Sequence, residues 1–320
     1  TADDFQGRFK VAWDEEYLVR VSLILAELAV HDPGGNWANR PSNSLHTILL
    51  PWFPQTLAPV EKRIVAVSTI RKEFPEIAWR LLLGLLPSHH QSSFGSRKPE
   101  WRLTISEDPK GKVTGEEYEK QILAYGEMAV QMACEDMPKL TTLLDDLENL
   151  PRTAFDSLLE YAASKAIASR PEEERVPVWQ ALTECAAKHR RYSDADWALP
   201  AELVTRIEDA AANLEPQKHE NLYARLFGTD SFDLYEENGN WREQEKKLAE
   251  RRQAAIQDLL HQEDLAAVIA FATDVESPFH VGFALGSIGS SEIDTSLLPS
   301  CLGNEEKANQ EFLQGYLWSR

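Results

Sequence analysis

The chain has 320 residues, of which 43% are hydrophobic, and its formal net charge at pH 7 is −19. This apolar share is typical of a folded protein and excludes a wholly disordered chain. The acidic balance disfavours nucleic acid and anionic membranes as partners, whereas it would steer a cationic protein surface toward the chain.

The cysteines indicate a reducing compartment. Cys134, Cys185 and Cys301 are far apart and form no Cys-x-x-Cys pair, so we expect free thiols rather than a disulfide framework. No secretory signal and no apolar run of membrane length occur, which favours a cytoplasmic protein. The chain starts at Thr1 rather than Met, and 312–318 resemble the middle of an amphipathic helix, so we expect a fragment of a larger protein.

Residues 1–87 predict a helical bundle. Apolar residues at helical spacing, separated by Pro- and Gly-rich corners, predict helices over 14–30, 45–50, 59–74 and 77–86. The segment 77–86 has one charge, Arg80, in an otherwise apolar sequence. A helix that is apolar on nearly every side must be surrounded by other helices. We therefore predict that it is central, with Trp79 and Leu82 buried.

Residues 88–114 form the longest stretch without helical periodicity. A loop of this length within a helical protein is usually functional or mobile. It is locally basic, and it contains aromatic and basic residues of the types that dominate protein–protein contacts. We predict partner-binding residues among them: His89, Phe94, Trp101 and Arg102. The alternative is a connecting loop whose Trp101 packs on the core.

Residues 115–320 predict a helical-repeat region. Expected helices cover 115–136, 139–150, 153–169, 176–189, 200–214, 216–227, 241–262, 264–273 and 277–288, with a last one from about 305. Pairing of helices every 35 to 45 residues or so is similar to TPR and HEAT arrays. No strict repeat signature occurs, and no strand pattern, so the predicted fold is all-α, an irregular α-solenoid.

Tryptophan is unusually frequent, with nine in the chain. Several lie in expected loops or at helix ends, where an indole can fill a helix junction and satisfy its N–H at the rim. These are Trp37, Trp52, Trp101, Trp197 and Trp241. We predict that Trp37 is a buried anchor of the loop before the second helix.

The motifs of common enzymes are absent from the sequence. There is no phosphate loop, no His-Glu-x-x-His and no Cys/His cluster with zinc spacing. Asp145–Asp146 and Glu172–Glu174 lie at expected helix ends, which favours a solvated or dipole-matching role over acid/base catalysis. Lys188, Arg190 and Arg191, around His189, are explained by complementarity to the C-terminal end of a helix and by pairing within the helix. The sequence therefore predicts no catalytic residue, no cofactor site and no metal site, and we expect that the fragment is not an enzyme.

Five phrases of the sequence are similar to a known family. They are DPGGNWANRP at 32–41, SLHTILLPWFPQT at 44–56, AWRLLLGLLP at 78–87, KPEWR at 98–102 and HRRYSDADWALP at 189–200. Together they resemble the C-terminal helical sensor region of antiviral STAND (Avs-type) bacterial defence NTPases. The resemblance covers about residues 13 to 290 and includes no catalytic motif.

The resemblance implies a protein-recognition domain of innate immunity against phage. It implies that the partner is a phage structural or packaging protein, that the parent protein homo-oligomerises, and that ATP and Mg belong to an NTPase module outside this fragment. Two alternatives remain open. One is a structural scaffold or oligomerisation segment without a ligand of its own. The other is an enzyme whose site lies in an unfamiliar helical fold.

Overall fold

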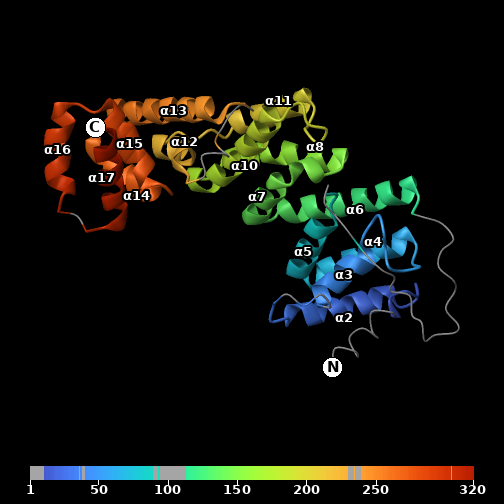
Figure 1. Cartoon of the computed structure of the whole chain (residues 1–320). Helices are drawn as coiled ribbons and strands as arrows, with labels where there is room; N and C mark the ends of the chain where they lie inside the picture. The colour runs from blue at the N-terminus through green and yellow to red at the C-terminus, as the bar shows by residue number, and fades with distance from the viewer. Residues whose placement is uncertain are drawn as a thin grey trace. The chain divides into compact units, whose positions relative to one another are not determined.

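The described part of the chain consists of helices and connecting segments, with no strand (Figure 1). It is a computed structural model that describes residues 11–35, 37, 40–88, 93, 113–229, 234, 239–303 and 305–320, with the backbone alone at Ser300. The predicted all-α class is confirmed. The solenoid arrangement stays a prediction.

The chain divides into two compact units, Thr1–Ala162 and Ala163–Arg320. The first contains α2 (Leu18–Val30), α3 (Pro41–Leu49), α4 (Val60–Glu73), α5 (Pro75–Leu85), α6 (Gly115–Ala133), α7 (Met137–Asp145), the 3-10 turn η1 (Leu147–Asn149) and α8 (Arg152–Ala162). The second contains α9 (Lys165–Ala168), α10 (Glu172–Arg191), α11 (Ala201–Ala212), α12 (His219–Tyr223), the 3-10 turn η2 (Ala224–Phe227), α13 (Trp241–Gln262), α14 (Leu265–Asp274), α15 (Pro278–Ile288), α16 (Ser291–Cys301) and α17 (Lys307–Ser319).

This division differs from the boundary expected within 88–114. The helix α6 begins after that stretch, yet it packs against both α4 and α5. Its start is fixed by a capping box at Thr114. The Thr114 hydroxyl accepts from the Glu117 N–H at 3.2 Å, and the Thr114 N–H donates to the Glu117 carboxylate at 3.2 Å. The first compact unit therefore extends to α8.

The helix α5 is the core of the first unit, as predicted. Leu82 is 0% and Trp79 is 7% exposed, and α5 contacts α2, α3, α4 and α6. Its one charged side chain within the apolar run, Arg80, is exposed and donates to the Glu76 carbonyl oxygen at 3.4 Å. An apolar helix that contacts four others buries apolar side chains on most of its circumference, which stabilises the fold of this unit.

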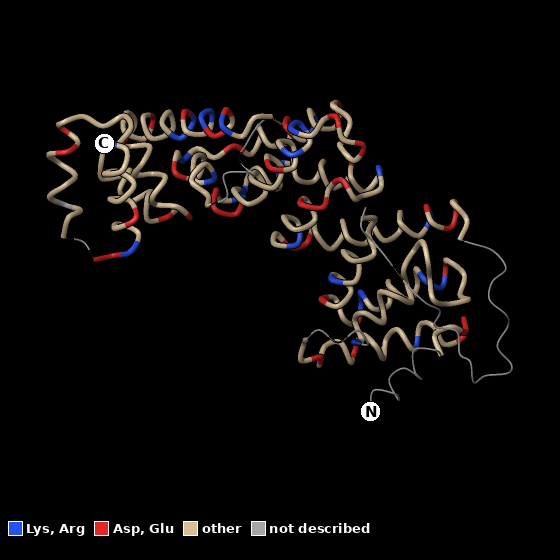
Figure 2. The backbone as a smooth tube through the Cα atoms, in the orientation of Figure 1, with Lys and Arg blue, Asp and Glu red and all other residues tan. Residues whose placement is uncertain are grey.

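The second unit has a core around α13, α14, α15 and α17, in which Phe312 and Tyr316 are fully buried. Acidic and basic residues are interspersed along α13 (Figure 2). The pair α15 and α17 approaches unusually closely. A Cβ atom placed on Gly282 would lie 1.9 Å from the Phe312 carbonyl oxygen, and one on Gly315 would lie 2.0 Å from that of Phe279. Glycine is therefore required at this crossing.

Several sequence predictions are corrected by the structure. The helix expected over 153–169 is interrupted between α8 and α9, and the helix α16 was not expected. Trp37 is 74% exposed and so is not a buried anchor. Instead, the loop around it is held by polar contacts, because Arg40 pairs with Asp32 at 2.8 Å and Asn43 donates to the Trp37 carbonyl oxygen at 3.3 Å. Trp241 is also exposed, at 63%.

Candidate functional site

The four predicted partner-binding residues, His89, Phe94, Trp101 and Arg102, lie outside the described residues. Their proposed role, and that of the loop 88–114, stays a prediction. A functional site among the described residues must therefore be sought elsewhere. One concavity there lies wholly within the second unit and was not anticipated from the sequence.

This concavity, which we call the α10 cleft, has a volume of about 570 Å³. One wall is a single face of α10, and the other is formed by η2, the residues after it and the end of α14. The lining residues are Gln180, Glu184, Ala187, Lys188, Arg191, Tyr192, Ala224, Arg225, Gly228, Thr229, Leu234, Asp274, Val275 and Glu276. Clefts that bind ligands commonly fall between about 300 and 1,000 Å³, so the size suits a side chain or short segment.

The second wall is tied to α10 at the start of α12. Glu172, the first residue of α10, accepts from the backbone N–H groups of Gln217 and Lys218, each at 3.1 Å, and from the Asn221 amide at 2.8 Å. Burial acts to raise the pKa of the Glu172 carboxyl, but these hydrogen bonds outweigh it and the pKa is lowered. The carboxylate thus holds the residues just before α12 against α10, and so positions α12 and the η2 turn that follows it.

Each cation of the cleft contacts a neighbouring side chain. The Arg225 guanidinium pairs with the Glu184 carboxylate at 2.9 Å. The Lys188 ammonium lies 5.4 Å from the centre of the Trp197 ring, and the Arg191 guanidinium lies 4.9 Å from that of Tyr192. Lys188 and Arg191 also occupy the last turn of α10, where cations complement the helix dipole.

Negative charge gathers at the α14 end of the cleft. Asp274 is the last residue of α14, whose final turn contains no basic residue, and Glu276 follows two positions later. One oxygen of Glu276 accepts from the Thr229 N–H at 3.3 Å and from its hydroxyl at 3.4 Å. The Asp274 carboxylate has neither a hydrogen bond nor an ion pair within the described parts of the chain. This end is therefore acidic, next to the negative pole of a helix.

Gly228 forms part of the cleft wall and leaves room there. Its φ and ψ are −69° and 163°, a conformation open to any residue. A Cβ atom here would lie 3.5 Å from the Arg225 carbonyl oxygen and 3.6 Å from the Glu276 carboxylate, both ordinary contacts. A larger side chain at this position would enter the cleft without straining the backbone.

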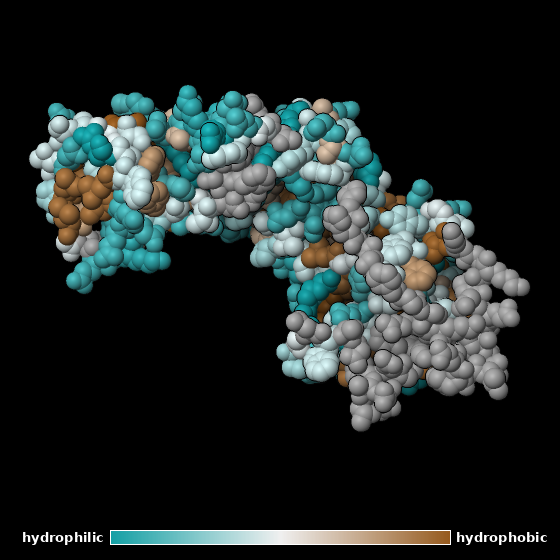
Figure 3. Space-filling view, viewed as in Figure 1, coloured by the Kyte–Doolittle hydropathy of each residue, from teal (hydrophilic) through white to brown (hydrophobic). Residues whose placement is uncertain are grey.

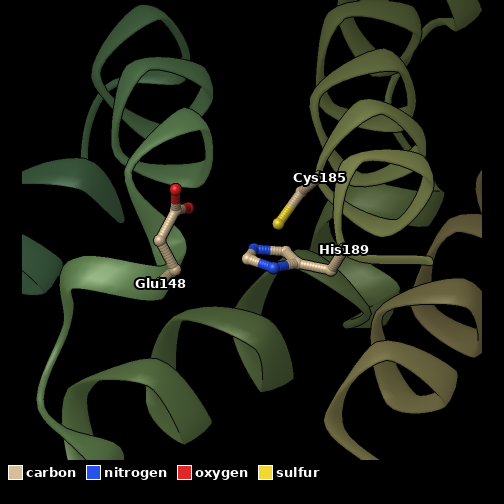
Figure 4. A group of neighbouring side chains, drawn as sticks. All are labelled: Glu148, Cys185 and His189. Carbon is tan, nitrogen blue, oxygen red and sulfur yellow. The ribbon is translucent and has the colours of Figure 1, made fainter. Parts of the chain in front are cut away.

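Cys185 and His189 extend from the same side of α10, one turn apart (Figure 4). The His189 side chain is 1% exposed, and its Nδ1 accepts from the Leu199 N–H at 3.1 Å. Its ring lies 5.5 Å from that of Trp197. Among its described residues, the second unit by itself offers no third metal ligand beside these two. We assign His189 to the packing of the loop 192–200 on α10, where Trp197 fills the junction as predicted.

A smaller cavity of about 200 Å³ lies between α13 and α15 in the same unit. His280 lines it with Phe279 and Phe283 on one side and Arg252 on the other. Burial, with a smaller contribution from Arg252, lowers the pKa of His280 from its ordinary 6.5 to about 4. Glu245 opposes this shift. The imidazole is therefore neutral in the folded unit at neutral pH.

This depressed pKa predicts acid sensitivity. Because the unfolded chain takes up a proton near pH 6.5 and the folded one only near pH 4, the contribution of His280 to stability falls as pH drops through this window. We expect His280→Gln to flatten the stability profile there, by on the order of 2 kcal/mol. Denaturant melts of both proteins between pH 7 and 4.5 would measure this change in the pH dependence of the unfolding free energy. His261→Gln, at an exposed position of α13, is the control and should leave the profile unchanged.

Among the described helices, none has the length and apolar character that crossing a membrane requires. In comparisons with protein-family models, curated proteins and solved structures, nothing matched this chain.

Proposed function

We propose that this chain is a protein-recognition module of a bacterial antiphage defence protein, and that its α10 cleft receives a segment of the partner. The cleft is the observation that carries the proposal, since its volume and its mixed polar and apolar lining suit a protein segment. The resemblance to antiviral STAND sensors, stated from the sequence, supports the same role. On this proposal the chain performs no reaction of its own.

The proposal extends to the setting of the chain. The parent protein would be cytoplasmic and homo-oligomeric, with ATP and Mg in a separate NTPase module, and the partner would be a phage structural or packaging protein. The succession of short helices in each unit is compatible with an irregular solenoid, an architecture that presents a long binding surface.

Binding of purified phage structural and packaging proteins to the purified chain tests the proposal. We expect one of them to bind and Gly228→Leu to abolish binding, because the leucine side chain would occupy part of the cleft. Gly303→Leu is the matched control, since a Cβ there has nothing within 4 Å. Unchanged circular dichroism would show that both variants fold. Equal binding by the two variants would remove the cleft from the proposal.

A scaffold or oligomerisation segment is the second candidate, and the outer face of α17 favours it. Leu317 and Trp318 are 53% and 74% exposed on this helix. Together with Leu313, they line a shallow concavity. The space-filling view shows a patch of hydrophobic surface near α16 and α17 (Figure 3). Such a face is typical of a contact with another helix. Light scattering would detect self-association that Leu317→Gln with Trp318→Gln abolishes.

A further inference from the structure

The charges of the α10 cleft distinguish what it can bind. Of its three cations, Arg225 pairs with the Glu184 carboxylate, and Lys188 and Arg191 lie against aromatic rings at the end of α10. The groups without a cationic counterpart among the described residues are Asp274 and Glu276, at the C-terminal end of α14.

We infer that the α10 cleft binds a basic side chain, arginine or lysine, of the partner protein, with the cation between Asp274 and Glu276. This inference rests on the proposed role of the cleft in protein recognition. The described lining also includes short apolar side chains that suit an aliphatic stem: Ala187, Ala224, Leu234 and Val275. A side chain with an apolar stem and a cationic tip matches both features.

Two physical effects favour such a ligand. The carbonyl end of α14 adds negative potential to the two carboxylates, and no basic residue in its last turn offsets it. The net charge of −19 would also raise the association rate of a cationic segment. Glu276 is oriented in advance by its hydrogen bonds to Thr229, so little ordering is required when a ligand binds.

The test uses the free compounds Nα-acetyl-argininamide and Nα-acetyl-lysinamide, with Nα-acetyl-citrullinamide as the neutral isostere of the first. Titration of the ¹⁵N-labelled chain should shift the backbone amide signals of Tyr192, Gly228 and Thr229 in a saturable manner. We expect the citrulline compound to leave these signals in place, because it offers no charge to the carboxylates. The arginine and lysine arms then rank the two basic side chains.

The double variant Asp274→Asn with Glu276→Gln should weaken binding at least about tenfold, as expected for the loss of some 1.4 kcal/mol of interaction. The amide oxygen introduced by Glu276→Gln can still accept from Thr229, so the wall should remain folded. Glu202→Gln with Glu292→Gln is the matched control, because it removes the same charge from exposed positions outside the cleft. Its affinity should equal that of the unmodified chain.

Several outcomes would overturn the inference. They are equal shifts with the citrulline compound, shifts at acidic surfaces outside the cleft alone, or unchanged affinity in the Asp274/Glu276 variant. Failure of the broader proposal looks different. If Gly228→Leu abolishes binding of a phage protein while the Asp274/Glu276 variant retains it, the recognition role stands and the basic ligand is wrong. If the basic compounds bind but no phage protein does, the basic ligand stands and the proposed recognition of a phage protein is wrong.

Discussion

Gly282→Ala is expected to destabilise the second unit by about 3 kcal/mol, at the upper end of the usual cost of overpacking. The added methyl group would lie 1.9 Å from the Phe312 carbonyl oxygen and 2.9 Å from the Tyr316 nitrogen. Backbone atoms cannot rotate out of the way as a side chain can, so α15 and α17 must separate. Alanine favours the helix by up to about 1 kcal/mol, and the packing cost must exceed this gain.

The reciprocal glycine provides a second test of the same crossing. Gly315→Ala would meet the Phe279 carbonyl oxygen at 2.0 Å, so it should cost a similar amount. Once one alanine has separated the helices, the other has space, and the double variant should cost clearly less than the sum. Hydrogen exchange over 278–288 and 307–319 would report the local loss. Gly303→Ala should leave exchange unchanged, and a Gly282→Ala protein as stable as the original would contradict this packing.

The helices themselves were largely predictable. The expected helix 241–262 has the bounds of α13, because a narrow apolar seam at Leu248, Ala255, Ile256 and Leu259 sets its period. Its start is fixed locally, since the Asn240 side chain accepts from the Arg242 N–H at 3.1 Å. Periodicity and capping are properties of neighbouring residues, which is why sequence alone reveals them.

The helix α16 shows where this reasoning fails. No helix was expected over 291–301, and the helix found there contains Pro299, a residue type that usually marks a helix end. The signal that could have revealed it is Ser290, whose hydroxyl accepts from the Ile293 N–H at 3.4 Å. Leu297 and Cys301, one turn apart, supply its buried side. The packing of this side on the second core outweighs the proline.

The α10 cleft could be anticipated only in part. The wall formed by α10 can be predicted from the sequence, because Glu184, Lys188 and Tyr192 recur at helical spacing and so lie on one face. The opposite wall comes from Gly228 and Glu276, which are distant in sequence and meet α10 only through the packing of η2 and α14. The exposure of Trp37 was also not predicted, because its position depends on contacts between distant parts of the chain. Loop side chains are placed by tertiary contacts that no local pattern encodes.

In the first unit, the largest effect is expected at the centre of α5. Leu82 is 0% exposed, and its helix contacts four others. Leu82→Ala removes the end of the side chain and leaves a cavity that the surrounding helices can only partly close. We expect a loss of about 2–5 kcal/mol, the range found for buried leucines. Because the chain has two units, the loss should be followed locally, by hydrogen exchange over 60–85 and 115–133 during denaturant melts.

Leu83→Ala is the matched control for this prediction. Leu83 follows Leu82 on the same helix, so both variants change helix propensity equally, but Leu83 is only half-buried. Its replacement should cost less than about 1 kcal/mol, since a partly exposed side chain leaves little or no cavity. The difference between the two variants then measures the packing of α5 alone. If both variants lose the same small amount, α5 does not form the centre of this unit.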